Sequence, residues 1–201
     1  TYNYSTGIGS VALAENTTGH DNTAVGREAM HYNTTGGQNT GIGKEALASN
    51  TTGGSNIAMG YQALDLNTTG YNNTGLGTSA LRANTTGIFN SAVGSGALYR
   101  NTTGNDNSAL GKDALLLNTT GSDNVASGYQ AMVSNTIGDN NTAIGVSALR
   151  SNTDGSSNAA LGHNALYGNI SGAFNVAICE EALKMNDHSY NVAIGNALTI
   201  S

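Results

Sequence analysis

Histidine, cysteine and carboxylate side chains are the groups of this 201-residue chain that could bind a metal or catalyse a reaction. The four histidines are His20, His31, His163 and His188, and each stands at a different position of a 17-residue repeat, so they cannot stack into a metal-binding column. The acidic residues lack the spacing of calcium-binding repeats. The sequence therefore predicts no metal, no cofactor and no enzymatic activity.

Two further reactive features have simple structural interpretations. An interrupted row of acidic side chains aligns at one repeat position and is typical of a solvated face. The row consists of Glu28, Glu45, Asp113 and Glu181. The single cysteine, Cys179, excludes an internal disulfide, and it replaces a glycine in an irregular unit, where we expect a small buried residue.

The repeat that carries these residues is a 17-residue unit of the form Asn-Thr-Ala-(Val/Ile/Leu)-Gly-x-x-Ala-Leu-x-x-Asn-Thr-Thr-Gly-x-x. Position one is the first Asn, and the unit from residue 175 is one residue short. A fixed short period predicts that residues 1–201 form a single array of stacked coils without a second domain. The units begin at residues 5, 22, 39, 56, 73, 90, 107, 124, 141, 158 and 175, with a truncated unit from 191.

Asparagine is the most regular polar residue of the unit. Position twelve is Asn in all eleven units, from Asn16 to Asn186, and position one is nearly as regular. We interpret these residues as stacked amide ladders that also satisfy the backbone of the turns. The alternative is glycosylation, since the Asn-Thr-Thr triplets and Asn169-Ile170-Ser171 match the acceptor pattern.

Threonine and aromatic side chains offer an alternative, ligand-binding function. Thr runs through position thirteen from Thr17 to Thr153, and such an array could bind ice, although adjacent Thr residues in an extended segment face opposite sides. Aromatic residues recur at position six and at position seventeen, where they could contact a glycan or pack on the next coil. These residues are Tyr61, Tyr129, Phe89 and Phe174.

The apolar positions predict where the core lies. Position four is Ile, Val, Leu or Met in nearly every unit and position nine is Leu or Met in each of the eleven full units, so we expect these two rows to form the core. Position eight is always Ala and position three is Ala or Gly, which indicates close packing against a neighbour. Charged side chains of the regular units avoid positions one to five, eight and nine, as a buried row requires.

Local propensities divide each coil into segments. Positions two to four read as a short strand, whereas positions six to eleven contain few β-branched residues and favour one helical turn over a bent second strand. Glycine at positions five and fifteen marks turns, where positive φ is common. With a rise of about 4.8 Å per coil, the expected parallel β-solenoid is a rod on the order of 55 Å long.

Composition narrows the possible partners. The net charge is −6 and the basic residues are scattered singly, which argues against nucleic-acid binding. No apolar run reaches the length of a membrane span, so we expect no membrane insertion. Proline is absent, as a continuous ladder of backbone hydrogen bonds requires.

The segments Asn22-Thr23-Ala24-Val25-Gly26, Asn90-Ser91-Ala92-Val93-Gly94 and Asn141-Thr142-Ala143-Ile144-Gly145 resemble the head repeats of trimeric autotransporter adhesins. The Asn-Thr-Thr-Gly arm is similar to repeats of phage tail-fibre-type proteins. The resemblance implies a left-handed parallel β-roll in a homotrimer at the cell surface or on a virion fibre. It implies a structural or adhesive fibre segment, with no receptor indicated. We expect position three or eight to face the threefold axis.

Overall fold

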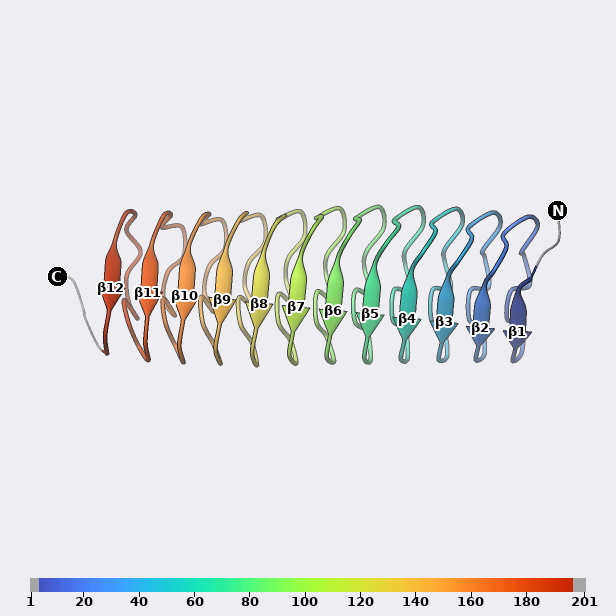
Figure 1. Cartoon of the computed structure of the whole chain (residues 1–201), viewed down its shortest axis with the longest axis horizontal. Coiled ribbons are helices and arrows are strands. Elements are labelled where there is room, and N and C mark those ends of the chain that lie inside the picture. The colour runs from blue at the N-terminus through green and yellow to red at the C-terminus, as the bar shows by residue number, and fades with distance from the viewer. Residues whose placement is uncertain (1–3, 197–201) are drawn as a thin grey trace.

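The computed structural model describes residues 4–196 and shows an all-β parallel solenoid, with no helix in that range. Each coil contributes one three-residue strand, and the strands stack in chain order into one parallel sheet (Figure 1). No helix that could cross a membrane occurs among these residues. The strands are β1 (Thr6–Ile8), β2 (Thr23–Val25), β3 (Thr40–Ile42), β4 (Ile57–Met59), β5 (Thr74–Leu76), β6 (Ser91–Val93), β7 (Ser108–Leu110), β8 (Val125–Ser127), β9 (Thr142–Ile144), β10 (Ala159–Leu161), β11 (Val176–Ile178) and β12 (Val192–Ile194).

The coils are stacked in register, as the constant period predicts. Val25 pairs with Ile42, and Ile42 pairs with Met59, so position four forms one continuous row. The register survives the short unit, where Val176 pairs with Val192 across a step of 16 residues. The missing residue is therefore absorbed outside the strands.

The side of the coil formed by positions six to eleven is neither a helical turn nor a strand, so the prediction of a helical turn is wrong. Its backbone is left-handed at positions seven and nine, with φ values of 60° at Glu45 and 53° at Leu47. The amides of positions seven and nine donate toward opposite neighbouring coils. The Glu45 amide donates to Arg27 O in the preceding coil, and the Leu47 amide donates to Ala63 O in the following coil. This side is thus a second ladder, which a single helical turn could not build.

Leucine in a left-handed conformation is unfavourable, at about 1–2 kcal/mol per residue. Every position-nine Leu or Met from Met30 to Leu183 adopts it, and all of them are fully or almost fully buried. Full burial of such a side chain contributes about 1.5–3 kcal/mol. Burial therefore outweighs the backbone strain, and it does so once in every coil.

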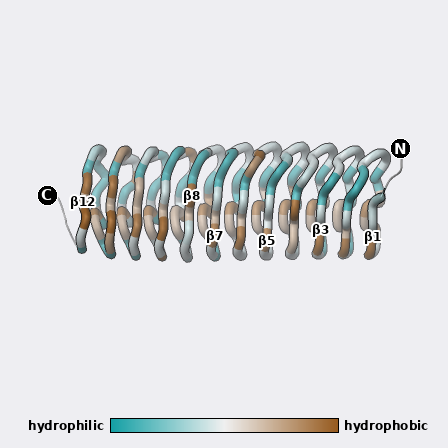
Figure 2. Tube along the Cα trace, viewed as in Figure 1, coloured by the Kyte–Doolittle hydropathy of each residue, from teal (hydrophilic) through white to brown (hydrophobic). Residues whose placement is uncertain are grey.

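The core is formed by positions three, eight and nine, so the assignment of position four to the core is wrong. Ala92, Ala97 and Leu98 of one coil are completely buried, whereas Val93 is 38% exposed. Side chains alternate across a strand, so when position three faces inward, positions two and four must face outward. The hydrophobic residues of position four therefore lie on the outside of the sheet, and hydrophobic colour recurs along the strand row (Figure 2).

The same burial corrects the expected trimer interface. Ala97 and Ala114 at position eight are fully buried inside their own chain, as are most residues of position three. They are small because the two walls of the coil approach closely there. Neither row is available to a second chain, so neither can face a threefold axis.

Two asparagine ladders fill the rest of the interior, which confirms the structural interpretation of these residues. At position twelve, Asn118 Nδ2 donates to Asn101 Oδ1 (2.8 Å) and to Gly121 O (2.9 Å). At position one, Asn107 Nδ2 donates to the same carbonyl (2.9 Å), and Asn107 Oδ1 accepts from the backbone amide of Asn124 (3.1 Å). These side chains are fully buried, and the pattern repeats along the rod. The turns of each coil are thereby tied to one another and to the neighbouring coil.

The two recurring glycine rows of the unit have different causes. Position five does have positive φ, between 131° and 142° for its glycines. Position fifteen does not, and the expectation of positive φ there is wrong. A Cβ at Gly121 would lie 2.5 Å from Gly138 O and 2.6 Å from Asn118 Oδ1. Glycine is required at position fifteen because the asparagine ladder and the next coil leave no space.

In the short unit, a side-chain oxygen takes the place of a backbone carbonyl as the hydrogen-bond acceptor of the turn. In a regular coil, one carbonyl such as Thr34 O accepts the amides of Thr17, Thr18 and Gly19. At the short unit, Asp187 Oδ1 accepts the equivalent three amides at 2.7–3.2 Å. Burial raises the pKa of Asp187, but these three hydrogen bonds more than offset it and the net shift is downward. The carboxylate repairs the turn ladder that the deletion interrupts.

Replacing Asn118 with Ala should lower the free energy of unfolding by about 3 kcal/mol or more. The substitution removes both donors of Asn118 and also the acceptor of Asn135 Nδ2, which leaves buried polar groups unpaired. Guanidinium denaturation followed by circular dichroism measures the change. The exposed Thr103→Ala serves as the control and should change stability by less than about 0.5 kcal/mol. Equal effects of the two substitutions would contradict the role of the ladder.

Candidate functional site

Asparagine and threonine of the turns are engaged in the fold. The position-twelve Asn residues of the glycosylation triplets from Asn33 to Asn169 are buried, and their Nδ2 atoms already donate two hydrogen bonds each, as at Asn50. Attachment of a glycan to the folded chain at these atoms would break the ladder. At position thirteen, the hydroxyl of Thr51 donates to Thr68 O (3.0 Å), and Thr68 repeats the contact to Thr85 O (3.0 Å). These hydroxyl groups stabilise the stack.

The sequence-predicted histidines do not converge, and the acidic row of position seven is only partly exposed, from 18% at Glu45 to 39% at Glu181. His20 contacts Asp21 (2.9 Å) and His163 contacts Glu180 (3.2 Å), and each of these four side chains is at least half exposed. The described part of the chain contains no group of three or more His, Cys, Asp or Glu residues that could hold a metal. Cys179 has a free thiol and a positive φ of 106° at a position that is otherwise glycine.

The outward sheet face is the first candidate surface. We use this name for positions two and four of β1 to β12, of which position four carries large apolar side chains. Leu110, Ile144 and Ile8 are 56%, 45% and 59% exposed. Ser127 interrupts the row, and a hollow of about 320 Å³ lies around it between β6 and β8. The face carries no charged residue among the described strands.

The second candidate surface is the wall formed by positions six, seven and ten, where cations lie over tyrosine rings. Lys44 Nζ lies 5.1 Å from the centroid of Tyr61, and Lys112 Nζ lies 5.9 Å from that of Tyr129. Arg82 and Arg150 lie over Tyr99 and Tyr167, and donate to their hydroxyl groups at 3.2 and 3.0 Å. We call this the cation–tyrosine wall.

The cation–tyrosine wall repeats every four coils, a period that inspection of the 17-residue unit missed. Residues 44, 61, 62, 79, 82 and 99 are Lys, Tyr, Gln, Ser, Arg and Tyr, and the same types return 68 residues later. At the exposed positions eleven, sixteen and seventeen of the same coils, residues 68 apart differ in type, and the one exception is Asn72 with Asn140. Comparison of the sequence with itself at a lag of four units would have found this signal. The second series is Lys112, Tyr129, Gln130, Ser147, Arg150 and Tyr167.

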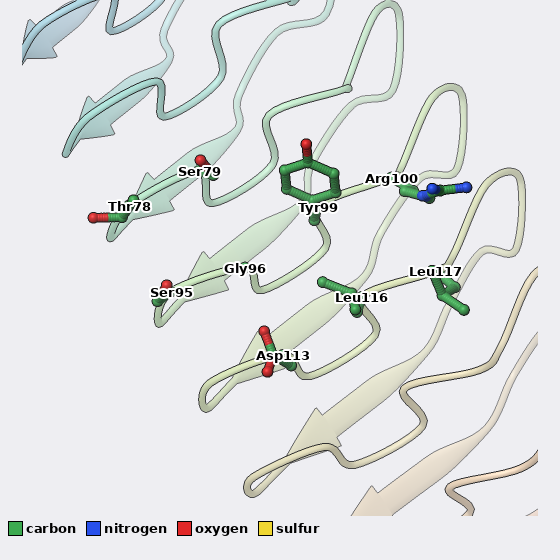
Figure 3. A pocket seen from close by; sticks show the side chains of 9 residues that line it. All are labelled: Thr78, Ser79, Ser95, Gly96, Tyr99, Arg100, Asp113, Leu116 and Leu117. Atoms are coloured by element: carbon green, nitrogen blue, oxygen red, sulfur yellow. The ribbon is translucent and has the colours of Figure 1, made fainter.

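The wall positions that differ between the two sets of four coils include position seven of the fourth coil, which is Gly96 in the first set and Asn164 in the second. A hollow lies at Gly96. Around Gly96 an open hollow of about 360 Å³ lies between three successive coils (Figure 3). Tyr99, Asp113 and Leu116 line it together with Ser79 and Ser95. Its geometry shows no nucleophile–base pair of the kind that catalysis requires.

The remaining aromatic residues pack along the turns. Tyr71 and Phe89 meet edge to face at 5.6 Å, and Phe174 stacks on Tyr190 at 5.1 Å. Phe89 and Phe174 therefore contact the preceding and the following coil respectively. Both rings are about half exposed, so they cover the turns without forming a cavity.

Comparisons of the chain with protein-family models, with curated proteins and with solved structures found no match.

Replacing Asp65 with Val should stabilise the protein at pH 7, because burial of the Asp65 carboxylate costs more than its ion pair with Arg82 returns. Burial raises the pKa of Asp65 above its ordinary value of 3.8, and the ion pair with Arg82 at 3.4 Å only partly opposes it. The equivalent residue of the second series, Val133, is buried to the same extent. A raised pKa in the folded state means that stability is lost as the pH rises through that pKa.

The stabilisation by Asp65→Val should accordingly grow between pH 3 and pH 7, and urea denaturation at both pH values measures it. Asp65→Asn is the matched control, since it removes the charge and keeps the shape. A substitution that destabilises equally at both pH values would contradict the dominance of burial at this site.

Proposed function

We propose that the chain is a rigid segment of an extracellular fibre, in which three copies associate side by side through the outward sheet face. The observation that carries the proposal is the long, uncharged row of large apolar side chains on that face, which only Ser127 interrupts among the described strands and many of which are 38–68% exposed. Monomeric soluble proteins rarely expose so long an apolar surface, and such patches mark association sites. The solenoid core alone is thin, with one large apolar side chain per coil, so association would add burial that the fold lacks.

A second copy of the chain is the partner that fits this face best. The side chains of position four recur with the strand spacing of about 4.8 Å along the rod. A parallel copy presents the same spacing, so its rows interdigitate with the first over the whole length. A partner without this period could match only a few coils. The absence of charge on the face also allows two like surfaces to meet without repulsion.

The number of copies and the location rest on the resemblance to trimeric autotransporter adhesin heads. That resemblance supports three chains around a common axis and display on a cell surface or a virion fibre. In such a fibre the segment holds a binding surface at a distance from its anchor, and it has no catalytic role. The proposed interface is position four with position two, in place of the buried alanine rows.

Ice binding by the threonine ladder is less well supported by the geometry. The position-thirteen hydroxyl groups donate to backbone carbonyls, as Thr85 does to Thr102 O (3.0 Å). A hydroxyl whose hydrogen is already engaged offers only acceptor sites to an ordered water layer.

Leu110→Glu combined with Ile144→Glu should convert the assembly into folded monomers. Both side chains point away from the core, so the charges face solvent in the monomer but face one another in the assembly. Sedimentation equilibrium measures the mass, and circular dichroism confirms that the fold is kept. The control places the same charges at Leu66 and Tyr129, which are similarly exposed outside the strands. A wild-type protein that sediments as a monomer at high concentration would contradict the proposal.

A further inference from the structure

The hollow around Gly96 owes its existence to a missing side chain. Position seven is left-handed in the eleven coils from Val11 to Glu181, and Gly96 follows the pattern with a φ of 70°. The same backbone carries Ser79 in the preceding coil and Asp113 in the following one, with φ values of 56° and 57°. The glycine is therefore not required by the conformation. A Cβ there would lie 2.6 Å from Asp113 Oδ1 and 3.3 Å from Leu116 Cδ1, so a side chain would fill the hollow.

Tyr99 forms a supported aromatic wall of the hollow. Figure 3 shows its ring beside Gly96, with Leu116 and Asp113 contributed by the next coil. Arg82 holds the ring from the preceding coil, with its guanidinium carbon 5.9 Å from the centroid and Nη1 3.2 Å from the hydroxyl. The ring is half-buried and fixed before any ligand arrives, which lowers the entropy lost on binding.

Three polar side chains of the hollow have no hydrogen-bond partner within the described part of the chain. Within residues 4–196, Asp113 makes no side-chain hydrogen bond or ion pair, although its carboxylate is half-buried. Glu45 occupies the same repeat position four coils earlier, and its carboxylate is fully engaged, with Lys44 at 3.0 Å and Gln62 at 2.7 Å. The hydroxyl groups of Ser79 and Ser95 are likewise unpaired in this part of the chain. A carboxylate and two hydroxyl groups thus remain free to bind a ligand.

We propose that this hollow binds one unit of a neutral saccharide. A sugar ring combines an apolar face, which would lie against Tyr99 and Leu116, with hydroxyl groups that would donate to Asp113 and bond to the two serines. An anionic ligand would meet the carboxylate of Asp113, whereas the guanidinium of Arg100, which also lines the hollow, extends away from Gly96 in Figure 3. A purely apolar ligand would bury the Asp113 charge without a partner. A volume of about 360 Å³ lies at the small end of ligand pockets and suits a single ring.

The saccharide site does not depend on the fibre assembly. It lies on positions six to eleven of the coils that begin at residues 73, 90 and 107, whereas the proposed interface is the outward sheet face. Failure of one proposal therefore leaves the other intact. If both hold, a trimer would carry three such hollows, and weak single-site binding would be strengthened by multivalency.

The test is a titration of the ¹⁵N-labelled protein with the methyl glycosides of galactose, glucose, mannose and N-acetylglucosamine, followed by NMR. At least one glycoside should shift the amide signals of Gly96, Asp113 and Leu116 with millimolar affinity. Gly96→Asn should weaken binding by about tenfold or more by filling the hollow. This variant should fold normally, because Asn164 adopts the same backbone at the equivalent place with a φ of 56°.

Tyr99→Ala should weaken binding to a similar extent, and Tyr167→Ala is its matched control. Tyr167 occupies the same repeat position and contacts Arg150 in the same way, but it lies outside the hollow. The control should change the affinity by less than about twofold. The proposal is overturned if none of the four glycosides shifts these signals, or if Tyr99→Ala and Tyr167→Ala weaken binding equally.

Discussion

The stacking of buried asparagine amides is the constraint on which the rest of this structure depends. Each position-twelve amide donates forward to the turn carbonyl of its own coil and backward to its copy, as Asn101 does with Gly104 O and Asn84 Oδ1. A buried amide without its partners is costly, so each coil must supply the same residue at the same place. This requirement fixes the 17-residue period and excludes a side chain at position fifteen. The hydrophobic contribution is small by comparison, since the interior holds one large apolar side chain and two alanine or glycine residues per coil.

A fold held in this way confines any function to the outer positions. The inward side chains are buried or hydrogen-bonded in the ladders, so residue types can vary between coils only at positions that face outward. Two outer surfaces nevertheless show a regular pattern of residue types. The outward sheet face is uniformly apolar at position four, with Ser127 as the exception, and this suits association along its whole length. The cation–tyrosine wall instead repeats its cations and tyrosines every four coils, and one of the positions that depart from this period, Gly96 against Asn164, coincides with the hollow. The first surface supports assembly and the second supports recognition.

Much of the fold could be predicted from the sequence because the repeat aligns equivalent residues directly. The strands at positions two to four, the register and the asparagine ladders are confirmed. The sidedness of the strand was predicted wrongly, since large apolar residues at position four suggest a core, whereas the narrow coil admits only Ala92 and its copies. The left-handed backbone at Leu98 was not foreseen, because nothing in a leucine indicates positive φ and only burial in the stack stabilises it. The hollow depends on one glycine in one coil, a signal that averaging over repeats removes.

Exchange of the asparagine side-chain amide protons tests the central claim most directly. Solution NMR can follow the Nδ2 protons of Asn67, Asn84 and Asn101 separately from those of exposed Asn72. The account predicts that the ladder protons exchange orders of magnitude more slowly than those of Asn72, and at similar rates in successive coils, because they leave the ladder only when coils separate. Rapid exchange of the ladder protons at rates like those of Asn72 would contradict it, and would mean that the backbone and the thin apolar core hold the stack without the amides.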